Sequence, residues 1–250
     1  MKDLKRLIAS GEQIIGAGIP FGSGKEDIEK LLDYYDYDFI SVDSQHSPSS
    51  EQYLQKICSI ALELDKPVHY RLDHRRHAYL IGNKLDMGPT SIEVPQTEEV
   101  HIAQEARDHF YYKPIGIRSW GGPGRPSDAI KDTPENYPEW WNKTGVLMLQ
   151  IETLNAINNI PNFALDGVDC FSWGPADLLL DRKSHPEHPF AKTDDDAMGH
   201  ALGLCKSTNT KLVVRSYDRK LRNRYFDKGV TVLMENPRAE GTLDSNLPFG

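Results

Sequence analysis

The chain has 250 residues, enough to bury a complete hydrophobic core, and residues 1–250 are expected to form one domain. Its 29 basic and 37 acidic residues give a net charge of -8, which argues against non-specific binding to nucleic acid. No run approaches the roughly 18 apolar residues of a membrane span. Residues 1–10 lack the apolar stretch of a signal peptide. Three widely spaced cysteines form no disulfide pattern, so a cytoplasmic protein without membrane partners is expected.

Short β-rich runs alternate with helical patterns along the chain. Strands are expected at 14–19, 38–43, 67–71, 91–95, 146–152, 168–173, 212–216 and 230–235. Helical patterns between them include 25–35, 51–64, 98–108 and 195–206. This alternation predicts parallel strands with crossover helices, and eight strands favour a (β/α)8 TIM barrel over an open doubly wound sheet. The connections at 119–144 and 181–194 are long enough to act as lids.

Two carboxylates follow neighbouring strands of the predicted barrel. Glu152 ends one strand, and Asp177 follows the next in Gly174-Pro175-Ala176-Asp177-Leu178. Chemistry in such barrels collects at the C-terminal ends of the strands. The pair therefore predicts a Mg²⁺ or Mn²⁺ site that a 2-keto acid can chelate, with the cation stabilising an enolate as a carbon–carbon bond breaks. The alternative is that Glu152 is a surface acid and Asp177 a helix N-cap.

Other polar residues are expected at the same mouth. Arg71 ends the third strand, where a guanidinium can donate to a developing enolate oxygen or neutralise the two carboxylates. Asp43 and His46 follow the second strand, and an Asp that orients a His makes a general acid–base unit. Gln150 presents its amide to this mouth or plugs the barrel interior.

Two competing site types are disfavoured. A Schiff-base aldolase needs a lysine at the mouth, whereas Lys66, Lys113 and Lys211 stand at strand starts. His185 and His188 have metal-ligand types, but the prolines beside them preclude a regular helical face, which favours a solvated loop.

Several motifs, in this order and spacing, resemble the class II 2-keto-acid (pyruvate) aldolases of the HpcH/HpaI family, over about residues 16–234. The motifs are Phe39-Ile40-Ser41-Val42-Asp43-Ser44-Gln45-His46, Tyr70-Arg71, Leu85-Asp86-Met87-Gly88, Val94-Pro95, Gly116-Ile117-Arg118-Ser119, Gln150-Ile151-Glu152-Thr153, Gly167-Val168-Asp169 and Gly174-Pro175-Ala176-Asp177-Leu178.

The resemblance implies a TIM barrel that assembles as a homo-oligomer, a hexamer or trimer, and uses Mg²⁺, Mn²⁺ or Co²⁺. It implies reversible cleavage of a 4-hydroxy-2-keto acid to pyruvate, or a related 2-keto acid, and an aldehyde.

The resemblance also implies a role for each site residue. Glu152 and Asp177 would bind the metal, Arg71 would stabilise the enolate beside Gln150, and His46, supported by Asp43, would transfer protons through water. Asp86 would reach a neighbouring subunit's site. The backbone of Gly174, Pro175 and Ala176 would receive the keto-acid carboxylate.

The chain departs from the family pattern in three places. Gln45 stands where many members carry Glu, Pro89 replaces a usual Ala, and residues 235–238 replace a Gly-Ser-Asp pattern. Residues 241–250 give no pattern for the final helix, so that helix is expected to be atypical or missing. Alternative functions are oxaloacetate decarboxylation, citrate-synthase-like condensation with an acyl-CoA, and non-catalytic binding of a keto acid.

Overall fold

A computed structural model describes residues 2–20, 22–121, 133, 135–190, 192–216 and 218–236 of the chain. Its strands pair in parallel and in chain order, and β1 bonds to both β2 and β8, so the sheet closes into a barrel. The strands are β1 (Ile14–Gly18), β2 (Phe39–Asp43), β3 (Val68–Arg71), β4 (Ser91–Val94), β5 (Val146–Ile151), β6 (Val168–Trp173), β7 (Lys211–Ser216) and β8 (Val232–Glu235). The (β/α)8 TIM barrel predicted from the sequence is therefore confirmed.

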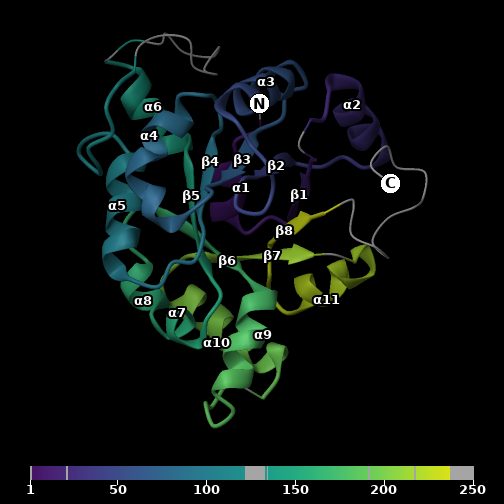
Figure 1. The fold of residues 1–250 in the computed structure, drawn as a ribbon, viewed down its shortest axis with the longest axis vertical. Helices are drawn as coiled ribbons and strands as arrows, with labels where there is room; N and C mark the ends of the chain where they lie inside the picture. The colour runs from purple at the N-terminus through teal and green to yellow at the C-terminus, as the bar shows by residue number, and fades with distance from the viewer. Residues whose placement is uncertain are drawn as a thin grey trace.

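Helices surround the ring of strands (Figure 1). They are α1 (Leu4–Ser10), α2 (Lys25–Tyr34), α3 (Glu51–Glu63), α4 (Ile81–Leu85), α5 (Val100–Phe110), α6 (Tyr137–Thr144), α7 (Leu154–Asn158), α8 (Ile160–Phe163), α9 (Pro175–Ser184), α10 (Asp194–Ser207) and α11 (Arg222–Asp227). Two short 3-10 helices are also present: Arg75–Leu80 precedes α4, and Arg219–Leu221 precedes α11. Alternating strand residues such as Ile40 and Val42 face these helices and form the larger apolar core with them.

The inside of the barrel has an apolar floor. Helix α1 contributes Leu4, Leu7 and Ile8 to one cluster with inward-facing strand residues, among them Phe39. Gly16 makes room for that ring, since a Cβ there would lie 2.2 Å from it. The N-terminal end of the barrel is thus closed, which leaves the C-terminal end for polar side chains.

Parts of the predicted connections have regular structure. Helix α6 lies within 119–144, although 122–132 and 134 lie outside the described residues. The second connection is shorter than expected, because α9 continues to Ser184 and α10 begins at Asp194. The prediction that the final helix is atypical or missing concerns residues 241–250, which lie outside the described residues. Across the described helices, none combines the length and apolar character of a membrane span.

Candidate active site

Arg71 and Asp43 form an ion pair at the C-terminal ends of β3 and β2, where the two residues are partners in the strand register. Arg71 Nε donates to Asp43 Oδ1 over 2.8 Å, and Nη2 donates to Oδ2 over 2.5 Å. Burial opposes ionisation of Asp43, but the guanidinium outweighs it and lowers the pKa of the carboxyl. Such a two-point contact fixes the plane of the guanidinium at the mouth.

The predicted contact between Asp43 and His46 is not formed. Asp43 accepts hydrogen bonds from Arg71 and from the backbone N–H of Gln45, and among the described residues there is no hydrogen bond between Asp43 and His46. The two side chains compete for Asp43. The Arg71 guanidinium on the adjacent strand is charged and donates two hydrogen bonds, so it binds the carboxylate in preference to the His46 imidazole. His46 itself is exposed to solvent after β2.

Gln150 and Glu152 lie on the other side of Arg71, at the end of β5. Arg71 Nη1 approaches Gln150 Oε1 at 3.5 Å. Both side chains pack against Gly174, where a Cβ would lie 2.5 Å from Glu152 Oε2 and 3.0 Å from Gln150 Nε2. Glycine is therefore required at the end of β6 for these two side chains to keep their positions.

The negative charge of Asp177 acts on the buried carboxyl group of Glu152. Glu152 is 2% exposed, and its Oε1 has no hydrogen-bond partner among the described residues. Burial, together with the negative charge of Asp177, raises the pKa of Glu152 to about 7. Asp177 is exposed in the first turn of α9. A buried carboxylate with a second carboxylate nearby is a pair of oxygen donors that could hold a hard divalent cation.

The segment Gly174-Pro175-Ala176 caps and begins helix α9, and Gly174 is in close contact with Glu152. Gly174 N donates to Ile151 O over 3.1 Å, which ties the start of the helix to the end of β5. Pro175 occupies the first turn, where its missing N–H costs nothing. The partial positive charge of a helix N-terminus attracts a carboxylate.

Among the described residues, Asp86 has a different set of neighbours. It follows α4 and accepts from Arg118 Nη2 at 2.9 Å. Both line a separate cavity of about 200 Å³ with Tyr79 and His109.

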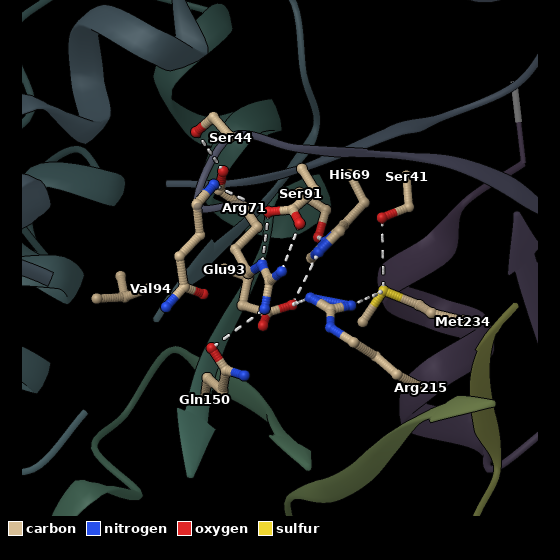
Figure 2. Close-up of polar contacts among 12 residues, drawn as sticks. Ser41, Ser44, His69, Arg71, Ser91, Glu93, Val94, Gln150, Arg215 and Met234 are labelled. Atoms are coloured by element: carbon tan, nitrogen blue, oxygen red, sulfur yellow. Dashed lines mark hydrogen bonds and ion pairs between the residues drawn. The ribbon is translucent and has the colours of Figure 1, made fainter. Parts of the chain in front are cut away.

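A buried polar network was missed by the sequence analysis. Glu93 on β4 is fully buried and accepts from Arg215 Nη2 at 2.6 Å, from a strand on the far side of the barrel. His69 Nε2 lies 3.1 Å from the same Glu93 oxygen, and His69 Nδ1 lies 2.8 Å from Ser91 Oγ (Figure 2). The sequence did contain a signal for this network, because Glu93 and Arg215 are charged residues within the buried strands β4 and β7.

The alternative histidine cluster is not supported. The described residues contain no group of three or more His, Cys, Asp or Glu side chains placed to hold a metal. His185 Nδ1 instead contacts Asp181 O, and His188 lies beside Asn158.

Comparisons with known proteins relate the chain to a family of aldolases. The profile described as "HpcH/HpaI aldolase/citrate lyase" matches residues 22–232. A 4-hydroxy-2-oxo-heptane-1,7-dioate aldolase from Shigella boydii is 26% identical over 229 residues, which cover 90% of this chain and 84% of that protein. A hydroxypyruvate/pyruvate aldolase from Sagittula stellata is 30% identical over 209 residues, 80% of this chain and 79% of that protein.

Among solved structures, an HpcH/HpaI aldolase from Desulfitobacterium hafniense superposes with a TM-score of 0.78 at 22% identity, over 93% of this chain and 89% of that chain. The family match, over most of the chain, and the barrel fold define the class of protein. The chain belongs to the HpcH/HpaI aldolase/citrate lyase family and is a carbon–carbon lyase.

Proposed function

We propose that this enzyme reversibly cleaves a 4-hydroxy-2-keto acid to pyruvate, or a related 2-keto acid, and an aldehyde, with the help of a divalent metal. The observation that carries the proposal is the buried Glu152 carboxylate near Asp177, with the paired guanidinium of Arg71 3.5 Å from Gln150 on the same strand end as Glu152. Negative ligands and a fixed cation are thereby brought to one barrel mouth.

Glu152 and Asp177 are the residues proposed to hold the metal, Mg²⁺, Mn²⁺ or Co²⁺. The unpartnered Glu152 oxygen and its raised pKa fit a cation at this point. Two protein carboxylates leave the remaining positions to substrate oxygens and water, as hard divalent ions require. When bound, such an ion supplies Lewis-acid polarisation of the keto group.

The protein residues position the keto acid for cleavage. The substrate carboxylate is proposed to lie at the N-terminus of α9, against the backbone of Gly174, Pro175 and Ala176. Arg71, held flat by Asp43, donates to the keto oxygen, on which negative charge grows as the bond between carbons 3 and 4 breaks. Gln150 lies close enough to Arg71 to orient the same end of the substrate.

Proton transfer completes the reaction. The C4 hydroxyl loses its proton, the electrons of the bond between carbons 3 and 4 move into the enolate, and the aldehyde leaves. Carbon 3 then takes up a proton to give the methyl group of pyruvate. His46 is proposed to carry these protons through water, since its ring is open to solvent. Because Asp43 is engaged by Arg71, His46 is proposed to act without support from that carboxylate.

Deuterium exchange tests the proposal without an aldehyde. In heavy water the enzyme should exchange the methyl protons of pyruvate, because exchange requires the enolate. A chelator should abolish exchange, and added Mg²⁺, Mn²⁺ or Co²⁺ should restore it. Exchange that persists at full rate in chelated enzyme overturns the metal assignment. No exchange under any metal supports a binding protein instead, and faster turnover of oxaloacetate than of hydroxy-keto acids supports a decarboxylase.

Assembly is a further part of the proposal. A homo-oligomer, a hexamer or trimer, would let Asp86 of one subunit reach the mouth of the next. Light scattering measures the assembly, and Asp86→Asn should lower the activity of the oligomer without dissociating it. A fully active monomer would contradict this role.

A further inference from the structure

A cavity of about 130 Å³ opens beside Arg71, and its lining does not include Glu152 or Asp177. Its walls come from β1, β2, β3, β7 and β8, and its polar lining includes Asp43, Arg71, Arg215 and Glu235. Arg71 lines this cavity and also approaches Gln150 at the end of β5, so it links the cavity to the strand ends after which Glu152 and Asp177 follow. In the proposed reaction the keto acid lies by Glu152 and Asp177, so the cavity is where the aldehyde half extends.

Arg215 is held rigidly in the cavity wall. Its Nη2 donates to Glu93 Oε2 over 2.6 Å, and its Nη1 lies 3.3 Å from Met234 Sδ. Glu93 in turn contacts His69, so the position of the guanidinium is set by residues from three other strands, β3, β4 and β8. In Figure 2, Arg71 and Arg215 both point toward Glu93. Rigid donors of this kind recognise a substrate oxygen at low entropic cost.

The cavity has no surplus of positive charge. Arg71 is paired with Asp43, and Arg215 with Glu93. Glu235 brings a carboxylate to the wall and is paired with Arg222, whose Nη2 lies 2.5 Å from Glu235 Oε2. A carboxylate on the aldehyde would therefore meet Asp43 and Glu235 without an unmatched cation. A hydroxyl group both donates and accepts, which suits a wall built of paired guanidinium and carboxylate groups.

We propose that this cavity is the aldehyde subsite and that Arg215 selects short aldehydes with a hydroxyl group beside the carbonyl. The inference rests on the proposed aldolase function and adds its acceptor class. Arg215 is the residue that distinguishes such an aldehyde from one without the oxygen.

The test uses aldehydes of two carbons that differ only in their oxygen. Wild-type enzyme is supplied with pyruvate and with glycolaldehyde, acetaldehyde or glyoxylate, and kcat/KM is measured for each. Glycolaldehyde should exceed both others by about tenfold or more, the effect of one hydrogen bond to a charged donor. Equal use of acetaldehyde, or preference for glyoxylate, overturns the inference.

Variants then assign the selectivity to Arg215. In Arg215→Met the ratio of glycolaldehyde to acetaldehyde kcat/KM should fall about tenfold, and the ratio cancels any general loss of activity. Arg224→Met is the matched control, since Arg224 is exposed on α11 and pairs with Asp195. An unchanged ratio in Arg215→Met overturns the role of Arg215.

Two further points keep the experiment decisive. Loss of Arg215 leaves Glu93 buried without its cation, so the double variant Glu93→Gln with Arg215→Met is measured as well. If both variants fail to fold, the wild-type ranking of the aldehydes decides alone. Deuterium exchange into pyruvate by the wild-type enzyme separates the two proposals. If exchange occurs but glycolaldehyde is not preferred, the inference about the aldehyde is wrong and the aldolase function is still supported.

Discussion

Gly174 and Glu152 are in such close contact that a single added carbon would displace the carboxylate. A Cβ at Gly174 would lie 2.5 Å from Glu152 Oε2 and 2.6 Å from its Cβ. The backbone at Gly174 has φ of -101°, so its requirement for glycine is steric and does not arise from backbone strain. The end of β6 therefore fixes the position of the Glu152 side chain at the end of β5.

Gly174→Ala should impair the site while leaving the barrel folded. A carboxylate displaced by about 1 Å is expected to lower the pyruvate exchange rate by about 100-fold and to weaken Mn²⁺ binding. Exchange is followed by NMR and binding by calorimetry. Gly203→Ala is the control, because nothing lies within 4 Å of that position in α10 and alanine there should stabilise by about 0.5–1 kcal/mol. Normal exchange and Mn²⁺ affinity in Gly174→Ala would contradict this account.

Asp43 should act through Arg71 and not through His46. In a double-mutant cycle on kcat/KM, Asp43→Asn and Arg71→Lys should couple by about 1 kcal/mol or more, since the two side chains share two hydrogen bonds. Asp43→Asn and His46→Asn should instead add to within about 0.5 kcal/mol. The opposite pattern, coupling to His46 and additivity with Arg71, would restore the acid–base pair expected from the sequence.

The sequence was sufficient to predict the barrel, because the strands are short apolar runs separated by regular helical patterns. The largest error in a strand boundary is at β8, expected from residue 230 and observed from Val232. The sequence also predicted that one end of the barrel carries Asp43, Arg71, Gln150 and Glu152, because the C-terminal ends of the strands of a barrel share one face. Helix α1 and its role as the barrel floor were not predicted.

Partners across the barrel could not be predicted in the same way. Whether Asp43 bonds His46 or Arg71 depends on the register between β2 and β3, which spacing along one strand does not reveal. The Glu93–Arg215 pair joins β4 to β7 across the interior, so it depends on how the closed barrel brings opposite strands together. A charge inside an apolar strand predicts that a buried partner exists without saying which residue it is.

Lys5 should stabilise the opposite end of the barrel from the candidate site. Its Nζ lies 2.8 Å from Asp169 Oδ1 and also donates to Tyr111 and to Gly145 O. Burial raises the pKa of Asp169, and Lys5 opposes that rise. Lys5→Met should therefore cost about 3 kcal/mol of unfolding free energy.

Urea unfolding of Lys5→Met measures this loss, and adding Asp169→Asn should recover part of it because the orphaned charge is removed. Lys143→Met is the control, as its pair with Glu139 is exposed and should contribute within about 0.5 kcal/mol. A Lys5→Met loss no larger than the control's would show that this pair does not support the floor.

Glu93 should make stability depend on pH in a defined window. Burial opposes its ionisation, but Arg215 and His69 outweigh burial and lower the pKa of Glu93 from 4.5 to about 2. A carboxyl whose pKa is lowered by folding stabilises the protein above its unfolded pKa, and this stabilisation is lost as pH falls through the folded pKa. The contribution is therefore complete above pH 4.5 and disappears toward pH 2.

Glu93→Gln removes this contribution. The variant should therefore have an unfolding free energy about 3 kcal/mol below that of wild type at pH 7, and this difference, the stability gap, should be smaller by about 1 kcal/mol at pH 3.5. Urea unfolding at the two pH values measures the gap. Glu139→Gln, on the exposed face of α6, should show almost no gap at either pH. A gap that stays constant or widens on acidification would mean that Glu93 is not held ionised by Arg215, and the fixed guanidinium invoked for aldehyde selection would lose its anchor.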